Sequence, residues 1–302
     1  MTTPYARSRR RRALLCAGAL LCAASTPARA QTLAPAQGCD ILSAAAPHGT
    51  FVLYDPAADA WTACDRERAE TRFLPASTFK LPHALIAIET GIVTNETAPF
   101  SWDKRERRIA AWNRDTSLAD GVRNSTVWVY QRTAKAIGWD RMNAWVRRFG
   151  YGNAEIGDAG GLAHFWLDGD LRISTTEQVL FLDALRRGAL PANPANQARV
   201  RAMAVVERAD GGDWRLHAKS GAVLPIDPKT GDIAPGPDAD ARLAGKERVG
   251  WYVGWVERPK DKGGDRVFAL NLRLTTDADL AKRKPLARAL LEANGALPPS
   301  RR

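Results

Sequence analysis

The order of strand-like and helix-like segments constrains the fold of this chain more than any other feature of its sequence. Residues 49–55 and 60–65 are β-like runs separated by a short turn, which predicts a hairpin. Strand-like sequence returns towards the other end of the chain, in residues 214–219, 249–257 and 266–275. The middle, roughly 92–210, is mainly helical in pattern. This order predicts an α+β protein whose antiparallel sheet is built from both chain ends and accompanies a helical subdomain.

Apolar residues at helical spacing mark the individual helices. Three of them are expected in the middle of the chain, at 127–136, 139–149 and 175–187. The third opens with Ser174 and Glu177 at the spacing of a capping box. Further helices are expected after Pro75, over about 79–90, and near the end of the chain at 286–293. Residues 224–248 are rich in Pro, Gly and Asp and predict a long loop, which in a compact domain is usually functional.

The N-terminal segment has the composition of an export signal. Residues 1–30 contain six arginines and no acidic residue, and the apolar run 13–24 is shorter than the roughly 20 residues that a membrane-spanning helix needs. The run is followed by Ala28-Arg29-Ala30, with small residues at the positions that a signal peptidase reads. We therefore expect residues 1–30 to be a cleaved signal peptide and residues 31–302 to form a single exported domain.

Net charge first suggests an anionic partner. The whole chain carries a formal charge of +11, and a strongly basic protein is a candidate for binding nucleic acid or an anionic membrane. Removal of the six signal-peptide arginines lowers the charge to +5, and residues 241–302 hold 14 basic against 7 acidic residues. No stretch interleaves aromatic residues with Lys and Arg as a nucleic-acid platform does. We expect no nucleic-acid partner, and no membrane association after signal cleavage.

Two cysteines, Cys39 and Cys64, remain in the mature chain. In an oxidising compartment they either form a disulfide that closes a loop of about 25 residues or stay as two buried thiols, and the sequence leaves both open. The four histidines are scattered and neither cysteine belongs to a C-x-x-C motif. We expect no metal site.

Ser77 and Lys80 are the first candidates for chemistry. Residues at i and i+3 share a helix face, so the Lys80 amine can reach the Ser77 hydroxyl. A serine needs a base to become a good nucleophile, and a lysine serves as one only when burial keeps it neutral or when it is modified. Ser101 and Lys104 have the same spacing, but Lys104 lies in a charge run typical of a solvated surface, whereas an apolar helix follows Lys80.

Four further polar clusters each have an ordinary structural explanation when considered alone. Ser125 can cap a helix, Tyr151-Gly152-Asn153 can form the turn after one, and Trp166 can be a core residue. Lys219-Ser220-Gly221 ends a predicted strand, where a glycine lets a ligand come close to the backbone.

Taken together, in this order and at these separations, the clusters resemble the class D serine β-lactamases, or oxacillinases. The resemblance covers about residues 49–291 and includes the segments 84–91 and 250–257. Ser220 stands where Thr is more usual in the family, and the 224–248 loop is long. The resemblance implies a β-lactamase/penicillin-binding transpeptidase-like fold, a periplasmic location and hydrolysis of the β-lactam ring, which confers antibiotic resistance.

The resemblance also implies roles in acyl transfer. Ser77 would attack the β-lactam carbonyl and form an acyl-enzyme, and the N–H groups of Ser77 and Ala222 would form the oxyanion hole. No metal or organic cofactor is implied, but Lys80 would take up CO2 on its side-chain nitrogen and become an anionic base for acylation and deacylation. Val127 and Trp166 would help to bury Lys80, and the Trp166 indole N–H would donate to the added carboxyl group.

Proton transfer and substrate binding would fall to the remaining residues. Ser125 would relay a proton to the leaving nitrogen, and Lys219 would keep the local potential positive and help that transfer. Ser220, beside Gly221 and Ala222, and Arg283 would bind the substrate carboxylate, for which the planar guanidinium is suited. His217, two residues before Lys219 on a strand, either lines the site or is a hydrogen-bonded structural residue.

Two other functions remain as alternatives. A penicillin-recognising transpeptidase or sensor-type domain would acylate without turnover, and a silent periplasmic binding protein would keep only the pocket. The sequence does not decide between monomer and homodimer, nor which β-lactams are preferred.

Overall fold

The fold was analysed in a computed structural model that describes residues 1, 33–227, 232–233, 243 and 245–300. The predicted signal peptide and most of the 224–248 loop lie outside the described residues. The principal strands are β1 (Leu33–Pro35), β2 (Gly49–Asp55), β3 (Ala60–Ala63), β6 (Val205–Arg208), β7 (Arg215–Ala222), β8 (Val249–Glu257) and β9 (Arg266–Arg273). The α-helices are α1 (Cys39–Ala45), α2 (Arg66–Glu70), α3 (Lys80–Glu89), α4 (Leu118–Arg123), α5 (Val127–Ile137), α6 (Trp139–Phe149), α7 (Thr175–Arg187), α8 (Pro194–Met203) and α9 (Asp279–Ala293).

Strands from both ends of the chain form one sheet. Within the described residues its order is β1-β3-β2-β9-β8-β7-β6, so the N-terminal hairpin lies beside C-terminal strand β9, with Thr50 opposite Asn271. This confirms the predicted α+β architecture. The sheet is antiparallel except that β1 runs parallel to β3, which makes it mixed at that edge.

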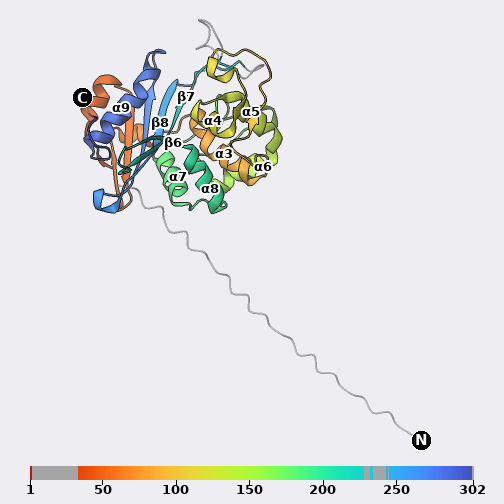
Figure 1. The fold of residues 1–302 in the computed structure, drawn as a ribbon, viewed down its shortest axis with the longest axis horizontal. Helices are drawn as coiled ribbons and strands as arrows, with labels where there is room; N and C mark the ends of the chain where they lie inside the picture. The colour runs from red at the N-terminus through yellow and green to blue at the C-terminus, as the bar shows by residue number, and fades with distance from the viewer. Residues whose placement is uncertain (2–32, 228–231, 234–242, 244, 301–302) are drawn as a thin grey trace. The chain divides into compact units, whose positions relative to one another are not determined.

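Helices cover both faces of the sheet. Along β8, Trp251, Val253 and Trp255 face the larger core, which includes α3 to α8. Tyr252 and Val256 face the opposite core, beneath α1 and α9. Figure 1 shows α9 on one side of the strands and α3, α4, α5 and α6 gathered on the other. The site lies where this helical group meets β7, because β7 packs against the segment that precedes α3.

Most predicted helices are confirmed, including α6 at its expected bounds and the capping box of Ser174 and Glu177 at the start of α7. The last helix begins at Asp279, about two turns before the predicted start at 286, so Pro285 lies inside α9 instead of before it. Asp279, the first residue of α9, accepts hydrogen bonds from the backbone of Thr275 and Thr276, which stabilises this early start.

Two further expectations about the elements were wrong. Residues 99–117 were expected to be mainly helical, but they contain the two short strands β4 (Pro99–Phe100) and β5 (Thr116–Ser117) and the 3-10 turn η2 (Ala110–Trp112). Strand β7 does not end at Lys219; it continues to Ala222, because the segment 219–222 stays paired with β8.

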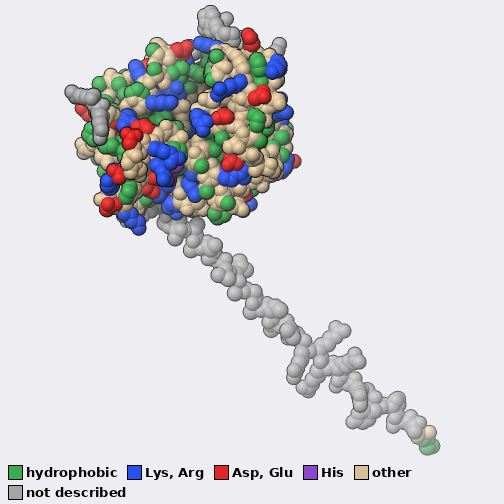
Figure 2. All heavy atoms as spheres, viewed as in Figure 1, with side chains coloured by type: hydrophobic (Ala, Val, Ile, Leu, Met, Phe, Trp, Pro, Cys, Tyr) green, Lys and Arg blue, Asp and Glu red, His purple; other side chains and the backbone are tan. Residues whose placement is uncertain are grey.

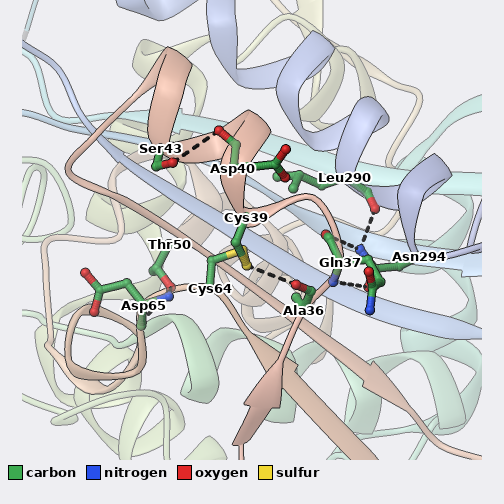
Figure 3. Close-up of a disulfide and its surroundings, with 10 residues drawn as sticks. All are labelled: Ala36, Gln37, Cys39, Asp40, Ser43, Thr50, Cys64, Asp65, Leu290 and Asn294. Carbon is green, nitrogen blue, oxygen red and sulfur yellow. Dashed lines mark hydrogen bonds between the residues drawn. A yellow bond between two sulfur atoms is a disulfide. The ribbon is translucent and has the colours of Figure 1, made fainter.

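The two mature-chain cysteines form a disulfide. Cys39, at the start of α1, is bonded to Cys64, which follows β3, and their Cα atoms are 5.2 Å apart (Figure 3). The bond links α1 to the N-terminal hairpin. Asn294, after α9, also holds this region, since its side chain bonds to the backbone N–H and C=O of Gln37 (Figure 3). Of the two alternatives that the sequence left open, the structure has the disulfide.

The surface carries charges of both signs. On the face shown in Figure 2, Lys and Arg side chains are interspersed with Asp and Glu. No helix in the described part of the chain is long and apolar enough to cross a membrane. The chain divides into two units, Met1–Gln31 and Thr32–Arg302, and apart from Met1 all described residues belong to the second.

Candidate active site

The segment that carries Ser77 is a 3-10 turn, η1 (Ala76–Phe79), directly before α3. Ala76 is fully buried and has a φ of +47°, in the left-handed region that costs a non-glycine residue on the order of 1 kcal/mol. The tight turn places Ser77 and Lys80 as the sequence predicted, with Lys80 Nζ 2.9 Å from Ser77 Oγ. Ser77 is partly exposed and thus accessible, whereas Lys80 is not.

Lys80 is fully buried, with 0% exposure. Its Nζ lies 5.2 Å from the centre of the Tyr130 ring on α5. Burial disfavours the charged amine and lowers the pKa of Lys80 to about 7. Near neutral pH a large share of Lys80 is therefore uncharged and chemically reactive.

Trp166 packs against two neighbours of this lysine on the nucleophile segment. Its ring stacks on Phe79 at 6.1 Å and meets His83 edge-on at 5.4 Å, so it contacts residues on both sides of Lys80 in the chain. Val127, at the start of α5, and Leu167 are buried in the same core. Trp166 is fully buried, and its Nε1–H has no hydrogen-bond partner among the described residues. An orphaned buried donor of this kind indicates a missing acceptor.

The loop that carries Trp166 is held by Tyr151-Gly152-Asn153. Asn153 donates to the carbonyl of Asp170 at 2.9 Å and accepts from the N–H of Arg172 at 2.8 Å. Gly152 has a φ of +59°, and a Cβ there would lie 1.9 Å from the Arg172 carbonyl oxygen. This motif therefore supports the site from a distance.

Two contacts that the sequence analysis missed also fix this loop. His164 Nδ1 lies 2.6 Å from Asp168 Oδ1, which closes the turn on either side of Trp166. Lys246, from the segment before β8, donates its Nζ–H to the carbonyl of Asp168. His164 and Asp168 have the i, i+4 spacing of a helical pair, but no helix was predicted over these residues, so the contact was not expected.

Ser125 and Lys219 form the second polar pair of the site. Ser125 lies between α4 and α5 with a φ of +57°, another non-glycine residue in the left-handed region. Lys219 Nζ, from the middle of β7, lies 3.0 Å from Ser125 Oγ and 2.8 Å from the carbonyl oxygen of Ser220. Burial, and after it the charges of Lys80, Arg283 and Lys284, holds the pKa of Lys219 well below its ordinary value.

Gly221 brings β7 against the nucleophile turn. A Cβ at this position would lie 3.1 Å from the Pro75 carbonyl oxygen and 3.2 Å from the Thr78 nitrogen. The absence of a side chain at Gly221 thus admits the backbone of η1, and the part in substrate binding that the resemblance implies for Gly221 stays a prediction. The Val223 N–H donates to the carbonyl of Val249, at the start of β8. Successive residues of an antiparallel strand direct their N–H groups to opposite sides, so the Ala222 N–H points away from β8.

Arg283 reaches the same end of β7 from α9. It donates to the carbonyl oxygens of Gly221 at 2.5 Å and Leu280 at 2.8 Å. Gly250, the first residue of the resembling segment 250–257, makes room for it: a Cβ there would lie 2.9 Å from Arg283 Cδ. Ser220, the residue before Gly221 on β7, is partly exposed.

His217 has the contacts of a structural histidine. Its Nδ1–H donates to the carbonyl of Arg201 at 3.0 Å, and its ring stacks on Trp255 at 4.5 Å. Its Nε2 is 3.3 Å from a carboxylate oxygen of Glu257.

A buried polar network supports η1 from α7. Gln178 donates to the Thr78 hydroxyl at 2.7 Å, and Thr78 donates to the Pro75 carbonyl, also at 2.7 Å. A glutamine within the apolar stripe of α7 was the signal that could have revealed it. Among the described residues, no cluster of three or more His, Cys, Asp or Glu side chains could hold a metal ion.

The fold and this arrangement define a penicillin-recognising serine acyl-transferase domain. The family model described as "Penicillin binding protein transpeptidase domain" matches residues 49–292. Among curated proteins, Beta-lactamase OXA-5 of Pseudomonas aeruginosa is 36% identical over 250 residues, 82% of this chain and 84% of that protein. Beta-lactamase OXA-2 of Salmonella typhimurium is 38% identical over 255 residues, 83% and 82% of the two chains.

Solved structures agree with these relatives. The class D β-lactamase YbXI from Nostoc superposes with a TM-score of 0.72 at 32% identity, covering 82% of this chain and 94% of that one. The class D β-lactamase FUS-1 (OXA-85) from Fusobacterium nucleatum gives 0.70 at 32% identity, covering 81% and 91%. The chain belongs to the class D β-lactamase family, which confirms the resemblance seen in the sequence.

Proposed function

We propose that this protein hydrolyses β-lactam antibiotics through an acyl-enzyme on Ser77, with a carboxylated Lys80 as general base. The observation that carries the proposal is the contact of 2.9 Å between the Ser77 hydroxyl and a fully buried lysine amine. Its membership of the class D β-lactamases supports the same activity.

Two features of the surroundings of Lys80 support a carboxyl group on its side-chain nitrogen. An uncharged amine adds to CO2 and releases a proton, and burial lowers the pKa of Lys80 to about 7, so the uncharged form is available. The orphaned Nε1–H of Trp166 supplies a donor for the resulting anion. When bound, this group supplies an anionic base that can accept a proton from the Ser77 hydroxyl and later from the hydrolytic water.

In acylation, Ser77 Oγ attacks the β-lactam carbonyl carbon and the carbon–nitrogen bond of the ring breaks. The N–H groups of Ser77 and Ala222 stabilise the oxyanion, a contribution typically on the order of 10²–10³ in rate for one donor. The leaving nitrogen takes a proton from the Ser125 hydroxyl. Lys219, 3.0 Å from Ser125 Oγ, replaces that proton.

Substrate binding is assigned to the end of β7. Ser220 and Arg283 would hold the carboxylate that most β-lactams carry, and the guanidinium donors not used by the Gly221 and Leu280 carbonyls would point to it. The part of the 224–248 loop in substrate preference stays a prediction. Export to the periplasm, cleavage after residue 30 and a monomeric or dimeric state also stay predictions.

Turnover tests the proposal against an acylating transpeptidase or sensor domain and against a silent binding protein. Purified protein is mixed with a large excess of a chromogenic cephalosporin, and we expect many equivalents to be hydrolysed. Ser77→Ala should hydrolyse none, whereas the matched control Ser101→Ala, in the other Ser-x-x-Lys sequence, should resemble wild type. Colour limited to one equivalent would indicate acylation without turnover, and a Ser77 that takes up no penicillin by mass spectrometry would indicate a binding protein.

A further inference from the structure

His83 is a buried histidine that the proposed chemistry does not use. It lies on α3, three residues after Lys80 and therefore on the same helix face, and its exposure is 0%. Its ring meets Tyr130 edge-on at 5.0 Å, the same ring that Lys80 Nζ contacts, and it meets Trp166 at 5.4 Å. His83 therefore packs against the same Tyr130 ring as the Lys80 amine.

The two ring nitrogens of His83 have different surroundings. Nε2 lies 3.1 Å from the Thr133 hydroxyl oxygen on α5, and that hydroxyl is also 3.1 Å from the carbonyl oxygen of Tyr130. Nδ1 is buried and has no hydrogen-bond partner among the described residues. Burial, with a smaller effect of Lys80, lowers the pKa of His83 to about 3, so the ring is neutral and carries one proton.

Thr133 allows that proton to sit on either nitrogen. A hydroxyl has one hydrogen to donate. When Thr133 donates to the Tyr130 carbonyl, His83 must donate from Nε2, and Nδ1 is a bare acceptor. When Thr133 donates to Nε2, the His83 proton moves to Nδ1, which becomes a donor. Nε2 has a hydrogen-bond partner in both tautomers. The preferred tautomer therefore depends on whether the group nearest to Nδ1 is a donor or an acceptor.

Carboxylation would change the Lys80 side chain from a hydrogen-bond donor into a hydrogen-bond acceptor. An unmodified Lys80 offers N–H donors, and its ammonium form offers nothing else, which favours a bare Nδ1. A carboxyl group on Lys80 offers two anionic oxygens, which favours a donor at Nδ1. Trp166 Nε1–H supplies one donor, and a second donor leaves fewer oxygen lone pairs of the buried anion without a partner.

We propose that His83 is a positioning residue for the carboxylated lysine: it changes tautomer when Lys80 takes up CO2, and its Nδ1–H then donates to an oxygen of the new carboxyl group. Thr133 accompanies the change by turning its hydroxyl from the Tyr130 carbonyl to Nε2. The inference rests on the proposed carboxylation of Lys80. His83 thereby raises the affinity of the pocket for CO2 without contacting the substrate.

The direct test is an NMR measurement of the His83 tautomer in the wild-type protein. With [15N]histidine labelling, the nitrogen shifts of His83 are recorded in CO2-free buffer and again with saturating 13C-bicarbonate, which also gives a carbamate carbon signal. We expect the protonated nitrogen to change from Nε2 to Nδ1 as the carbamate signal grows. A carbamate signal with an unchanged tautomer overturns the role of His83 alone. Turnover without any carbamate signal overturns the carboxylation itself.

Variants supply a second measurement, the bicarbonate concentration that half-saturates the carbamate signal. His83→Leu should raise it by about tenfold to a hundredfold, the usual worth of one hydrogen bond to a charged group. His83→Asn, which keeps an N–H donor near the position of Nδ1, should restore most of the affinity. Thr133→Val should lower the affinity for CO2. The matched control Thr90→Val should not change it, although it removes a similar hydroxyl-to-backbone hydrogen bond, to the Ile86 carbonyl on α3. Equal affinities for His83→Leu and His83→Asn would contradict the proposal.

Discussion

Lys219 Nζ lies 3.0 Å from Ser125 Oγ, although 94 residues separate them in the chain. The two belong to different parts of the fold, since Lys219 is on β7, next to the edge strand β6, and Ser125 is on the turn between α4 and α5. Lys219 is 3% exposed and its pKa is lowered, first by burial and then by neighbouring cations. A lysine in this environment gives up its proton more readily than an exposed one, which suits a relay through Ser125 to the leaving nitrogen.

This relay predicts that Ser125 and Lys219 act as one unit. Ser125→Ala and Lys219→Ala should each slow acylation by about 10²–10⁴-fold, the usual contribution of general acid–base catalysis. The double variant should be little slower than the worse single one, because both changes interrupt the same proton path. Stopped-flow measurement of acylation with a penicillin gives the three rates. Losses that multiply in the double variant would show that the two residues act independently.

Trp166 is predicted to matter most after the acyl-enzyme has formed. Trp166→Phe keeps an aromatic ring between Phe79 and His83 but removes the orphaned Nε1–H, so the carboxyl group on Lys80 loses a donor. We expect deacylation to slow more than acylation, and an acyl-enzyme on Ser77 to accumulate in mass spectra taken during turnover. Trp255→Phe, a buried ring away from Ser77, is the control. Equal slowing of both steps by Trp166→Phe would contradict this assignment.

Burial of Lys80 predicts a stability that depends on pH. The lysine pKa is about 7 in the folded protein, against 10.5 for an unperturbed lysine. Between these values the unfolded chain binds more protons, so the stability of CO2-free wild type rises with pH in this window. Below about pH 7 both states hold the proton, and the full cost of burying the ammonium, on the order of a few kcal/mol, remains.

Lys80→Met removes that cost. In CO2-free buffer its stability relative to wild type should be greatest at pH 7 and below and should shrink as the pH rises towards 10.5. Urea unfolding at several pH values measures the difference, with the exposed Lys104→Met as a control that should show no such trend. A difference that stays constant with pH would mean that Lys80 titrates near its ordinary pKa in the folded protein.

The part of the site that is local in sequence was predictable from the residues. Ser77 and Lys80 are three residues apart, and the apolar helix after Lys80 already indicated burial. The contact between Ser125 and Lys219 was not predictable in this way, because it depends on how the helical group meets β7; only the family resemblance indicated it. The same holds for Gly221, whose neighbour turned out to be the backbone of η1.

The errors at element ends also have physical causes. Pro285 is normally a helix breaker, but it lies inside α9, whose start is fixed at Asp279, where the Thr275 and Thr276 N–H groups donate to the carboxylate. The end of β7 was placed too early because Ser220 and Gly221 have low strand propensity, and pairing with Tyr252 and Trp251 on β8 outweighs it. His83 was overlooked because a histidine on an apolar helix gives no sign of its tautomer until Thr133 is placed beside it.

The pair of His164 and Asp168 predicts a second pH effect, opposite in sign to that of Lys80. The hydrogen bond to Asp168 raises the pKa of His164 above its ordinary value, aided by the charge of Asp158 and opposed by burial and Lys246. A raised folded pKa means that the pair stabilises the protein fully below the unfolded pKa of about 6.5 and loses this contribution as the pH rises through the folded value. Because both side chains are partly exposed, we expect no more than about 1 kcal/mol.

His164→Gln should therefore be less stable than wild type at pH 5.5 and close to it at pH 9, as measured by urea unfolding. Since the pair closes the turn that presents Trp166, the same variant should also release CO2 from Lys80 more easily, seen as a higher bicarbonate requirement for the 13C carbamate signal. Asp168→Asn should reproduce both effects, because it removes the charge that His164 contacts. His48→Gln, a change at a histidine outside the site, is the control. A stability difference independent of pH, together with unchanged CO2 affinity, would show that this pair does not hold the Trp166 turn.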